Sequence, residues 1–315
     1  MKYHVHPLSP ADTVASMFSI GQRTRQPAAM PPAPAWAGVG ACTLPETELA
    51  VRQPAPQRLP YHLLALTTAG QGTVEVDFDT RECRPGTVVW IRPGQAVRFG
   101  GQEGLDAALV SWEPQLLSGD QLPGLTTEDA GPTASRDLQR TDAETIGDGF
   151  ARLAGDCDRL SPGPVAASLL RHELAVLLLR MALLTRPDGE SPPSAEARTF
   201  ARFRRTLEEG HAASRRVEDY AAQLGCSVRT LTRASLATTG RTAKQVVDDR
   251  VALEARRMLA CTDDSVAEVG RSLGFPEPTN FGRFFHREVG QSPGTFRAGV
   301  RDGWNHVPEQ RVAVE

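Results

Sequence analysis

Two short groups of polar residues carry the clearest chemistry in this sequence, and they recur about 50 residues apart. The groups are Arg229, Thr232 and Arg233, and Thr279, Asn280, Gly282 and Arg283. An arginine can make paired hydrogen bonds to guanine, and an asparagine can make them to adenine. Gly282 offers no side chain for such a contact. These residue types therefore predict recognition of base edges, not the making or breaking of a bond.

Both groups lie in copies of one longer pattern. The first copy contains Val217, Tyr220, Ala221, Leu224, Gly225, Leu231, Arg233, Gly240 and Thr242, and the second contains Val266, Val269, Gly270, Leu273, Gly274, Phe281, Arg283, Gly290 and Ser292. Apolar residues three and four apart predict helices, and Gly225 and Gly274 suit the left-handed turn that ends a helix. Each copy thus predicts a helix-turn-helix whose second helix presents its polar group outward, toward a major groove.

A single helix is expected between the two copies, from Ala243 to about Asp263. Val247, Val251, Ala255 and Leu259 share one face of it. At about 1.5 Å per residue, eighteen residues span roughly 27 Å. Such a rod suits two recognition helices about one DNA turn, ~34 Å, apart.

The charge distribution agrees with a nucleic-acid partner. The net charge is −3, but residues 195–301 hold 18 basic and 13 acidic residues, a charge of +5, whereas the remainder holds 17 basic and 25 acidic residues, a charge of −8. The positive charge therefore accompanies the repeat, as attraction to phosphates requires.

The stretch LGFPEPTNFGRFFHREVGQSPGTFR, from Leu273 to Arg297, closely resembles the signature of AraC/XylS-type transcriptional regulators. The first copy and the connecting helix resemble the rest of that DNA-binding module, so the resemblance covers about 100 residues. It implies that the base-reading positions fall on the two polar groups named above. One departure is Ser235, where the family usually has an aromatic residue.

The stretch from Tyr61 to about Trp112 has the pattern of short antiparallel strands. Apolar runs flank Ala69-Gly70-Gln71-Gly72 and Pro93-Gly94, and Leu105 to Trp112 forms a further candidate strand. This spacing predicts a small barrel or jelly roll. The segment also resembles, over a shorter length, the cupin-like sensor domain of AraC/XylS regulators. The expected fold class is therefore α+β: a cupin-like β-barrel with a helical dimerisation segment, followed by an all-α double helix-turn-helix domain.

The strand segment lacks the residues of a catalytic metal site. A metal-dependent cupin needs three or four converging donors, but only His62 is available, and Val97 and Arg98 stand where a later histidine is expected. We therefore predict no catalytic residue, no metal and no cofactor. A barrel interior can still enclose a small molecule. The candidate ligand-binding residues are His62, Trp90, Arg92 and Trp112, each of which can equally be an ordinary strand residue.

Helical spacing returns after residue 133, with one helix from about Asp142 to Leu160 and a second beginning after Pro164. In the second helix an apolar seam alternates in steps of four and three. The seam consists of Leu170, Leu174, Leu177, Met181 and Leu184. This seam predicts a dimer interface or, as an equal alternative, a helix that covers its own domain. The family resemblance favours the dimer.

The five cysteines are widely scattered and form no Cys-x-x-Cys pair. This arrangement favours a reducing compartment with buried thiols, and no apolar run is long enough to span a bilayer. The expected location is therefore cytoplasmic.

These patterns divide the chain into five expected parts. They are an N-terminal, partly irregular arm (1–56), a cupin-like sensor and dimerisation domain (57–185), a linker (186–194), an AraC-type DNA-binding domain (195–301) and a tail (302–315). We expect a sequence-specific transcriptional regulator controlled by a small-molecule effector. Its expected partners are double-stranded DNA, a second copy of the chain, the effector and RNA polymerase, with no membrane. The alternatives are a cupin-type enzyme with a DNA-binding tail and a ligand-independent regulator whose N-terminal domain only dimerises.

Overall fold

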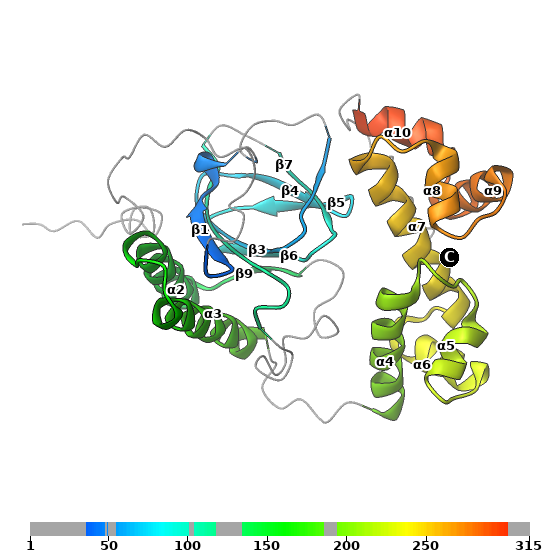
Figure 1. The fold of residues 1–315 in the computed structure, drawn as a ribbon, viewed down its shortest axis with the longest axis horizontal. Helices are drawn as coiled ribbons and strands as arrows, with labels where there is room; N and C mark the ends of the chain where they lie inside the picture. The colour runs from blue at the N-terminus through cyan, green and yellow to red at the C-terminus, as the bar shows by residue number, and fades with distance from the viewer. Residues whose placement is uncertain are drawn as a thin grey trace, which may run out of the picture. The chain divides into compact units, whose positions relative to one another are not determined.

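The computed structural model describes residues 36–47, 49, 55–100, 104–117, 134–185 and 194–301. The predicted tail, most of the predicted linker and the first 35 residues of the predicted arm lie outside them. The chain divides into two compact units, formed by most of residues 1–192 and by residues 193 onward (Figure 1). Among the described residues, no helix combines the length and the apolar character needed to cross a membrane.

The first unit contains two antiparallel sheets. The five-stranded sheet has the order β1 (Val39–Thr43), β8 (Asp106–Trp112), β3 (His62–Ala69), β6 (Thr87–Ile91) and β9 (Ala134–Asp137). The four-stranded sheet has the order β2 (Gln57–Arg58), β7 (Ala96–Gly100), β4 (Gly72–Val76) and β5 (Asp79–Cys83). The α+β prediction is confirmed, but the expected closed barrel is not formed, because no described strand of one sheet pairs with a strand of the other.

The two glycine-containing turns predicted from the sequence connect the sheets. β3 and β6 belong to the five-stranded sheet, whereas β4 and β7, which follow them, belong to the four-stranded sheet. Gly70 has a φ of +70°, and a Cβ added there would lie 1.9 Å from the carbonyl oxygen of Gly104. Only glycine therefore fits where the chain crosses between the sheets.

The hairpin between β4 and β5 has no glycine in its turn and was not predicted from the sequence. Its turn residues, Asp77 and Phe78, both have positive φ values, 54° and 74°. Asp77 accepts hydrogen bonds from the Gln95 side chain, at 2.6 Å, and from the backbone N–H of Ala96, at 3.1 Å. These bonds hold a turn that Asn-Gly or Asp-Gly usually forms.

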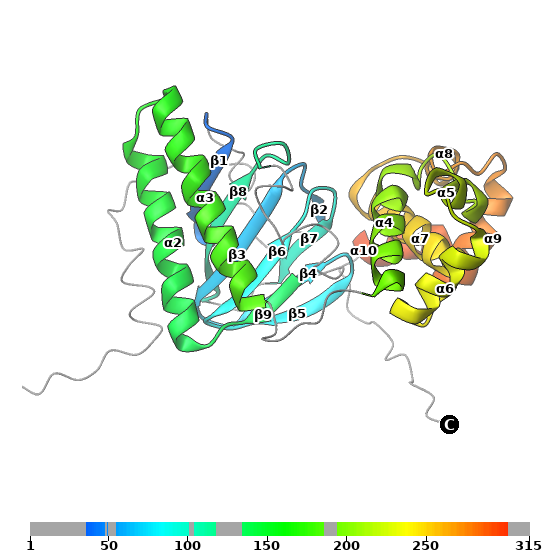
Figure 2. The ribbon, with the colours of Figure 1, turned by 90° about the horizontal axis from the view of Figure 1, so that it is seen from below.

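Strand alternation divides the core of the first unit into two layers. In β3, β6 and β8, odd-numbered residues such as Leu63, Val89 and Leu109 face the second sheet, whereas even-numbered residues such as Leu64 and Val110 face the helices. The helices are α2 (Arg140–Arg159) and α3 (Pro164–Thr185), which lie side by side across the five-stranded sheet (Figure 2). A short 3₁₀ helix, η1 (Leu44–Glu46), follows β1.

The second unit is all helical, as predicted. It contains α4 (Ala195–Gly210), α5 (Val217–Gln223), α6 (Val228–Thr239), α7 (Ala243–Cys261), α8 (Val266–Ser272), α9 (Pro278–Val289) and α10 (Pro293–Arg301). Figure 1 shows α7 between the α5–α6 and α8–α9 pairs. The predicted apolar face of α7, from Val247 to Leu259, is fully buried. The whole helix has 19 residues and is roughly 28 Å long. The predicted rod is therefore present.

Candidate nucleic-acid interface

The first helix-turn-helix consists of α5 and α6. Gly225 adopts a φ of +64° after α5, and the Ser227 hydroxyl caps α6 by accepting a hydrogen bond from the backbone N–H of Thr230 at 3.1 Å. Tyr220 and Leu231 are fully buried between the helices. This packing fixes which side of α6 faces outward.

The second helix-turn-helix, α8 and α9, repeats this geometry with closer packing. Gly274 has a φ of +74°, and a Cβ added to Gly270 would lie 3.1 Å from the Cβ of Phe281. The small residue is therefore needed where α9 crosses α8, as the repeat predicts. Phe281, Phe284 and Phe285 are all buried, so the opposite face of α9 is turned outward.

The predicted base-reading residues occupy the outward faces of α6 and α9. Arg229, Arg233, Thr279, Asn280 and Arg283 are exposed, and Thr232 is half-buried. The two copies thus present two separate surfaces of hydrogen-bonding groups, both in the same compact unit. This arrangement has the form needed to reach base edges in successive major grooves.

Arg233 has an acidic neighbour on α4. Its Nε lies 3.6 Å from a carboxylate oxygen of Glu196, while 70% of the Arg233 side chain stays exposed. An ion pair with this much exposure contributes little stability. Arg233 can therefore exchange Glu196 for another acceptor at small cost.

A basic cleft beside the second helix-turn-helix was not predicted from the sequence. It has a volume of about 500 Å³ and contains Asn280 and Arg283 of the predicted base-reading set. The other cations that line it are Arg215, Lys244 and Arg287. Because these residues come from three separate segments, no local spacing links them.

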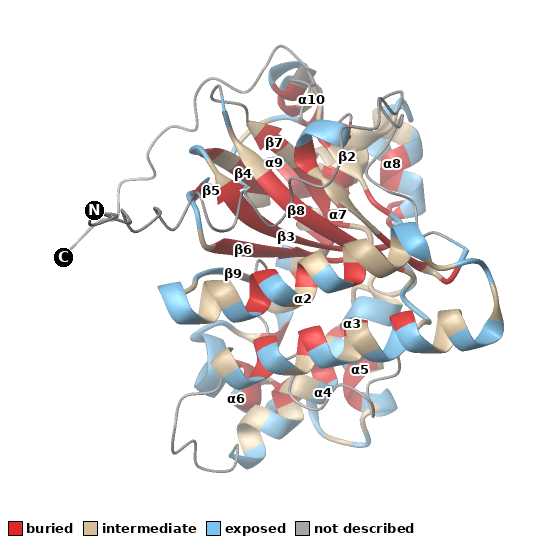
Figure 3. Ribbon diagram, turned by 90° about the vertical axis from the view of Figure 1, so that its left-hand side faces the viewer, coloured by how far each residue is buried: buried red, intermediate tan, exposed pale blue. Residues whose placement is uncertain are grey.

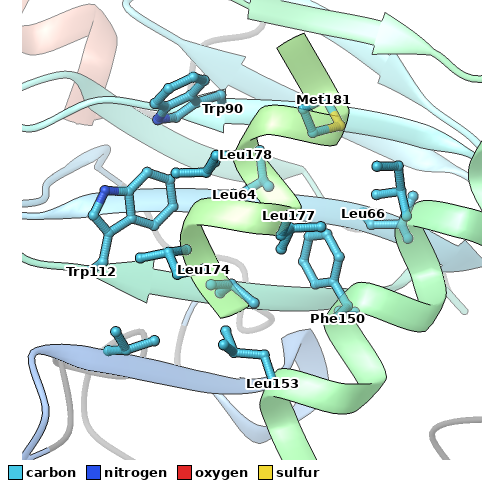
Figure 4. Close-up of a cluster of buried hydrophobic side chains, with 14 of the residues drawn as sticks. Leu64, Leu66, Trp90, Trp112, Phe150, Leu153, Leu174, Leu177, Leu178 and Met181 are labelled. Atoms are coloured by element: carbon cyan, nitrogen blue, oxygen red, sulfur yellow. The ribbon is translucent and has the colours of Figure 1, made fainter. Parts of the chain in front are cut away.

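The predicted ligand-binding residues form one cluster, but not inside a barrel. The His62 ring stacks on Trp112 at 4.8 Å between centroids and accepts a hydrogen bond from Trp90 Nε1 at 3.2 Å, and Arg92 lies over Trp90. Trp90 and Trp112 pack in the core layer that faces α2 and α3, not in the layer between the sheets (Figure 4). The strand pattern predicted their alternation but not which face meets the helices.

Burial of His62 has an electrostatic consequence. Loss of solvent around the ring, and secondarily the nearby charge of Arg92, lowers its pKa to about 4. The imidazole is thus neutral near pH 7, when it accepts the indole N–H.

The predicted dimer seam on α3 faces the interior of the first unit. Leu170, Leu174, Leu177 and Met181 are buried there with α2 and the sheet, and Leu184 is partly buried against them (Figure 4). Residues already packed in this core are not available to a second copy, so the assignment of this seam to a dimer interface is not supported. The alternative, a helix that covers its own domain, fits these five residues.

A different face of α3 carries exposed apolar side chains, and α2 and α3 alternate between buried and exposed positions along their lengths (Figure 3). Val165, Leu169, Val176 and Leu183 are 83%, 44%, 50% and 71% exposed. With His172 and the half-buried Leu179, they follow steps of four and three, the spacing of a coiled-coil seam. We call this set the outer α3 stripe.

No group of three or more His, Cys, Asp or Glu side chains in the described part of the chain has the arrangement of a metal site. His62, the one candidate ligand from the sequence, is instead engaged with two tryptophans.

Two family models match the chain, one in each unit. A model of an AraC-like ligand binding domain matches residues 50–146, and a model of a helix-turn-helix domain matches residues 220–299. The second match contains α6 and α9 in full.

Curated relatives include transcriptional regulators of enterobacteria. The HTH-type transcriptional activator RhaS of Salmonella schwarzengrund (strain CVM19633) is 30% identical over 151 residues, which cover 48% of this chain and 52% of the relative. RhaS of Salmonella paratyphi B (strain ATCC BAA-1250 / SPB7) is 26% identical over 249 residues, which cover 76% and 86%. The chain spans about half the length of the first curated relatives it matches.

Two solved structures are also similar to parts of this chain. The DNA-binding domain of AdpA, in complex with a target DNA, is 33% identical, with a TM-score of 0.30 over 35% of this chain and 95% of that one. ToxT from Vibrio cholerae O395 is 6% identical, with a TM-score of 0.44 over 84% and 98%. Similarities this low carry no functional argument.

The family identity thus depends on the matches in sequence and on the geometry described above. A ligand-binding-domain match precedes a helix-turn-helix match in one chain, and the second unit holds two helix-turn-helix pairs joined by a single long helix. This chain belongs to the AraC/XylS family of transcriptional regulators.

Proposed function

We propose that this protein regulates transcription by binding duplex DNA at specific sites through α6 and α9. The observation that carries the proposal is the pair of outward polar surfaces on these helices, held in one unit by α7. Arg229, Thr232 and Arg233 read one major groove, and Thr279, Asn280 and Arg283 read the next. Relatives named as transcriptional activators support RNA polymerase as a further partner.

We further propose that a small-molecule effector acts through the first unit. The match to an AraC-like ligand binding domain supports this role. An effector changes DNA binding only if its affinity differs between two states of the protein. The division into arm, sensor, linker, DNA-binding domain and tail at the predicted boundaries is part of the same proposal.

The proposed dimer forms through the outer α3 stripe. Its exposed residues span roughly 27 Å along the helix, and the four–three spacing is self-complementary between two copies. Burial of these side chains removes from water an apolar strip that only His172 interrupts, and the inner face of the helix keeps its contacts with the sheet.

Selection of binding sites from a random duplex library, with the full chain as bait, tests the DNA-binding proposal. We expect enrichment of a motif with two conserved segments whose centres lie about 10 base pairs apart. Retention of duplexes without any enriched motif would overturn sequence-specific recognition. A thermal-shift screen of metabolites then tests the effector, because a specific ligand at 100 times its Kd stabilises the folded state by about 2.7 kcal/mol.

A further inference from the structure

The basic cleft is built from the second helix-turn-helix, from the helix that joins the two copies and from the segment just before α5. Arg215 precedes α5, Lys244 and Asp248 belong to α7, and Arg283 and Arg287 belong to α9. Phe275, Pro276, Asn280 and Phe284 complete its walls. An anion held here would therefore contact three separate segments of the second unit at once.

Asp248 holds two of the cations in place. Its carboxylate is largely buried, with 11% of the side chain exposed, and its two oxygens contact Lys244 Nζ and, at 3.4 Å, Arg287 Nη2. The side chains of Lys244 and Arg287 stay 57% and 63% exposed. Arg287 also pairs with Glu288 at 2.6 Å. The carboxylate thus orients the charged ends and leaves them accessible from the cleft.

Arg215 is held by the turn between α8 and α9. Its guanidinium lies 3.6 Å from the centroid of the Phe275 ring, and its Nη2 donates a hydrogen bond to the carbonyl oxygen of Gly274 at 3.0 Å. Burial lowers the pKa of Arg215, and the charge of Asp248 opposes this effect only in part. An anion bound next to this guanidinium would stabilise its charged form.

The charge balance and the walls of the cleft favour one class of ligand. Four cationic side chains and a single carboxylate line it. Three of the remaining lining residues, Phe275, Pro276 and Phe284, are apolar, and an ionic contact is stronger beside apolar walls than in bulk water. Arginine and lysine together suit a phosphate oxygen, which accepts several hydrogen bonds.

The location of the cleft indicates where the phosphate comes from. Asn280 and Arg283 line the cleft and also belong to the proposed base-reading surface of α9. A duplex that offers base edges to these side chains must carry its sugar-phosphate backbone next to them. The cleft therefore lies beside the path of the backbone between the two grooves.

We propose that this cleft binds a backbone phosphate of duplex DNA through Arg215, Lys244 and Arg287, beside the base-reading Arg283. The inference depends on the proposed function, since it deepens the description of how the same module holds DNA. A phosphate here fixes the register of the duplex and carries no sequence information. Because Arg215 precedes α5, Lys244 belongs to α7 and Arg287 belongs to α9, the contact also links the second recognition helix to the connecting helix and to the segment before α5.

Salt dependence of binding to random duplex DNA is the first test, and it needs no knowledge of the operator. Each lost phosphate contact reduces the slope of log K against log salt by about 0.9, which corresponds to roughly five- to tenfold weaker binding at 0.1 M salt. We expect this change for Arg215→Ala and Lys244→Met in the full chain. Lys244→Arg, which keeps the charge, should retain the wild-type slope.

Arg216→Ala is the matched control for Arg215→Ala. Arg216 is the next residue, is 74% exposed, carries the same charge and does not line the cleft. Its removal should leave the slope within error of wild type. Equal changes for Arg215→Ala and Arg216→Ala would overturn the assignment to the cleft, because they would reflect net charge alone.

A duplex with single neutral methylphosphonates locates the phosphate. On a selected binding site, a methylphosphonate at one backbone position should weaken binding of the wild-type protein about as much as Arg215→Ala weakens binding to the unmodified duplex. At that position the two changes should not add, since both remove the same contact. Additive losses at every position would overturn the inference while leaving sequence-specific binding intact, whereas absence of specific binding by wild type would count against the proposed function itself.

Lys244 offers a direct readout, because the sequence contains only one other lysine, Lys2. Acetylation by an amine-reactive reagent, followed by mass spectrometry, should show Lys244 protected by duplex DNA relative to Lys2. Inorganic phosphate at millimolar concentration should protect it much less. Protection by inorganic phosphate without protection by duplex would assign the cleft to a free anion and reject the DNA backbone as its ligand.

Discussion

Ser235 on α6 and Phe285 on α9 occupy equivalent positions in the two helix-turn-helix pairs, and both are fully buried, yet they fill the position differently. Ser235 Oγ donates to the carbonyl oxygen of Leu231, 2.8 Å away on the same helix. Phe285 instead packs against Phe281 and Phe296, with ring centroids 5.9 and 5.6 Å apart. The second copy therefore has an aromatic core that the first lacks at this point.

This difference predicts unequal costs of truncation. Phe285→Ala removes a buried ring and should lower the free energy of unfolding of the second unit by about 3 to 5 kcal/mol. Ser235→Ala removes only a hydroxyl bonded within its own helix and should cost about 1 kcal/mol or less. Calorimetry of the full chain, with duplex added to identify the transition of the DNA-binding unit, measures both. Similar losses from the two substitutions would show that the first copy depends on this position as much as the second.

The DNA-binding unit could be predicted in detail because its signals are local. Gly225 and Gly274 adopt the left-handed conformation that the repeat requires, and Ser227 caps α6. The sequence could not predict the basic cleft, because Arg215 and Arg287 are 72 positions apart in the chain. They line the same cleft only when the helices of the second unit pack together.

The first unit was less predictable because strand alternation is symmetric between two faces. His62 and Leu63 point to opposite sides of β3, and both sides are covered, one by helices and one by the second sheet. The same limit applies to α3, which has two apolar seams. The helix period cannot tell which seam packs on the sheet, and the richer seam, around Leu174, is the buried one.

Arg233→Ala and Arg283→Ala test direct base readout. Each should weaken binding to a selected site by roughly 1 to 3 kcal/mol per lost base contact and leave binding to random duplex nearly unchanged. Competition binding with the two DNAs at one salt concentration gives both values. If affinity for random duplex fell as much as affinity for the selected site, the arginine would contact phosphate only.

Glu196→Gln should strengthen DNA binding. Glu196 lies 3.6 Å from Arg233 and competes with DNA for its guanidinium. Since the pair is exposed, the gain should be modest, at most about 1 kcal/mol, and should shrink as salt rises. Fluorescence anisotropy at two salt concentrations measures it. The double variant Glu196→Gln with Arg233→Ala is the control, because without the arginine the glutamine should bring little gain, and a full gain in that background would exclude this mechanism.

Val176→Asp combined with Leu183→Asp tests the proposed dimer. Both residues are exposed within one copy, so the unit should stay folded, whereas two buried carboxylates should prevent association through the outer α3 stripe. Sedimentation equilibrium should find a dimer for wild type and a monomer for the variant. Arg171→Asp, an exposed change on α3 outside the stripe, should leave the dimer intact. If the variant stayed dimeric, the dimer interface could not be the outer α3 stripe.

The environment of His62 predicts a pH dependence of stability in the first unit. Burial, and then Arg92, lowers its pKa in the folded state to about 4, below the value of 6.5 expected when unfolded. Above pH 6.5 the ring is neutral in both the folded and the unfolded state, so its full contribution to the stability of the folded state is present. As the pH falls from 6.5 to 4, only the unfolded state takes up the proton, so stability is lost across this window, by up to about 3 kcal/mol. Urea denaturation should show this loss for wild type and a smaller one for His62→Gln. If His62→Gln and wild type lost stability in parallel between pH 6.5 and 4, the histidine would not be the group responsible.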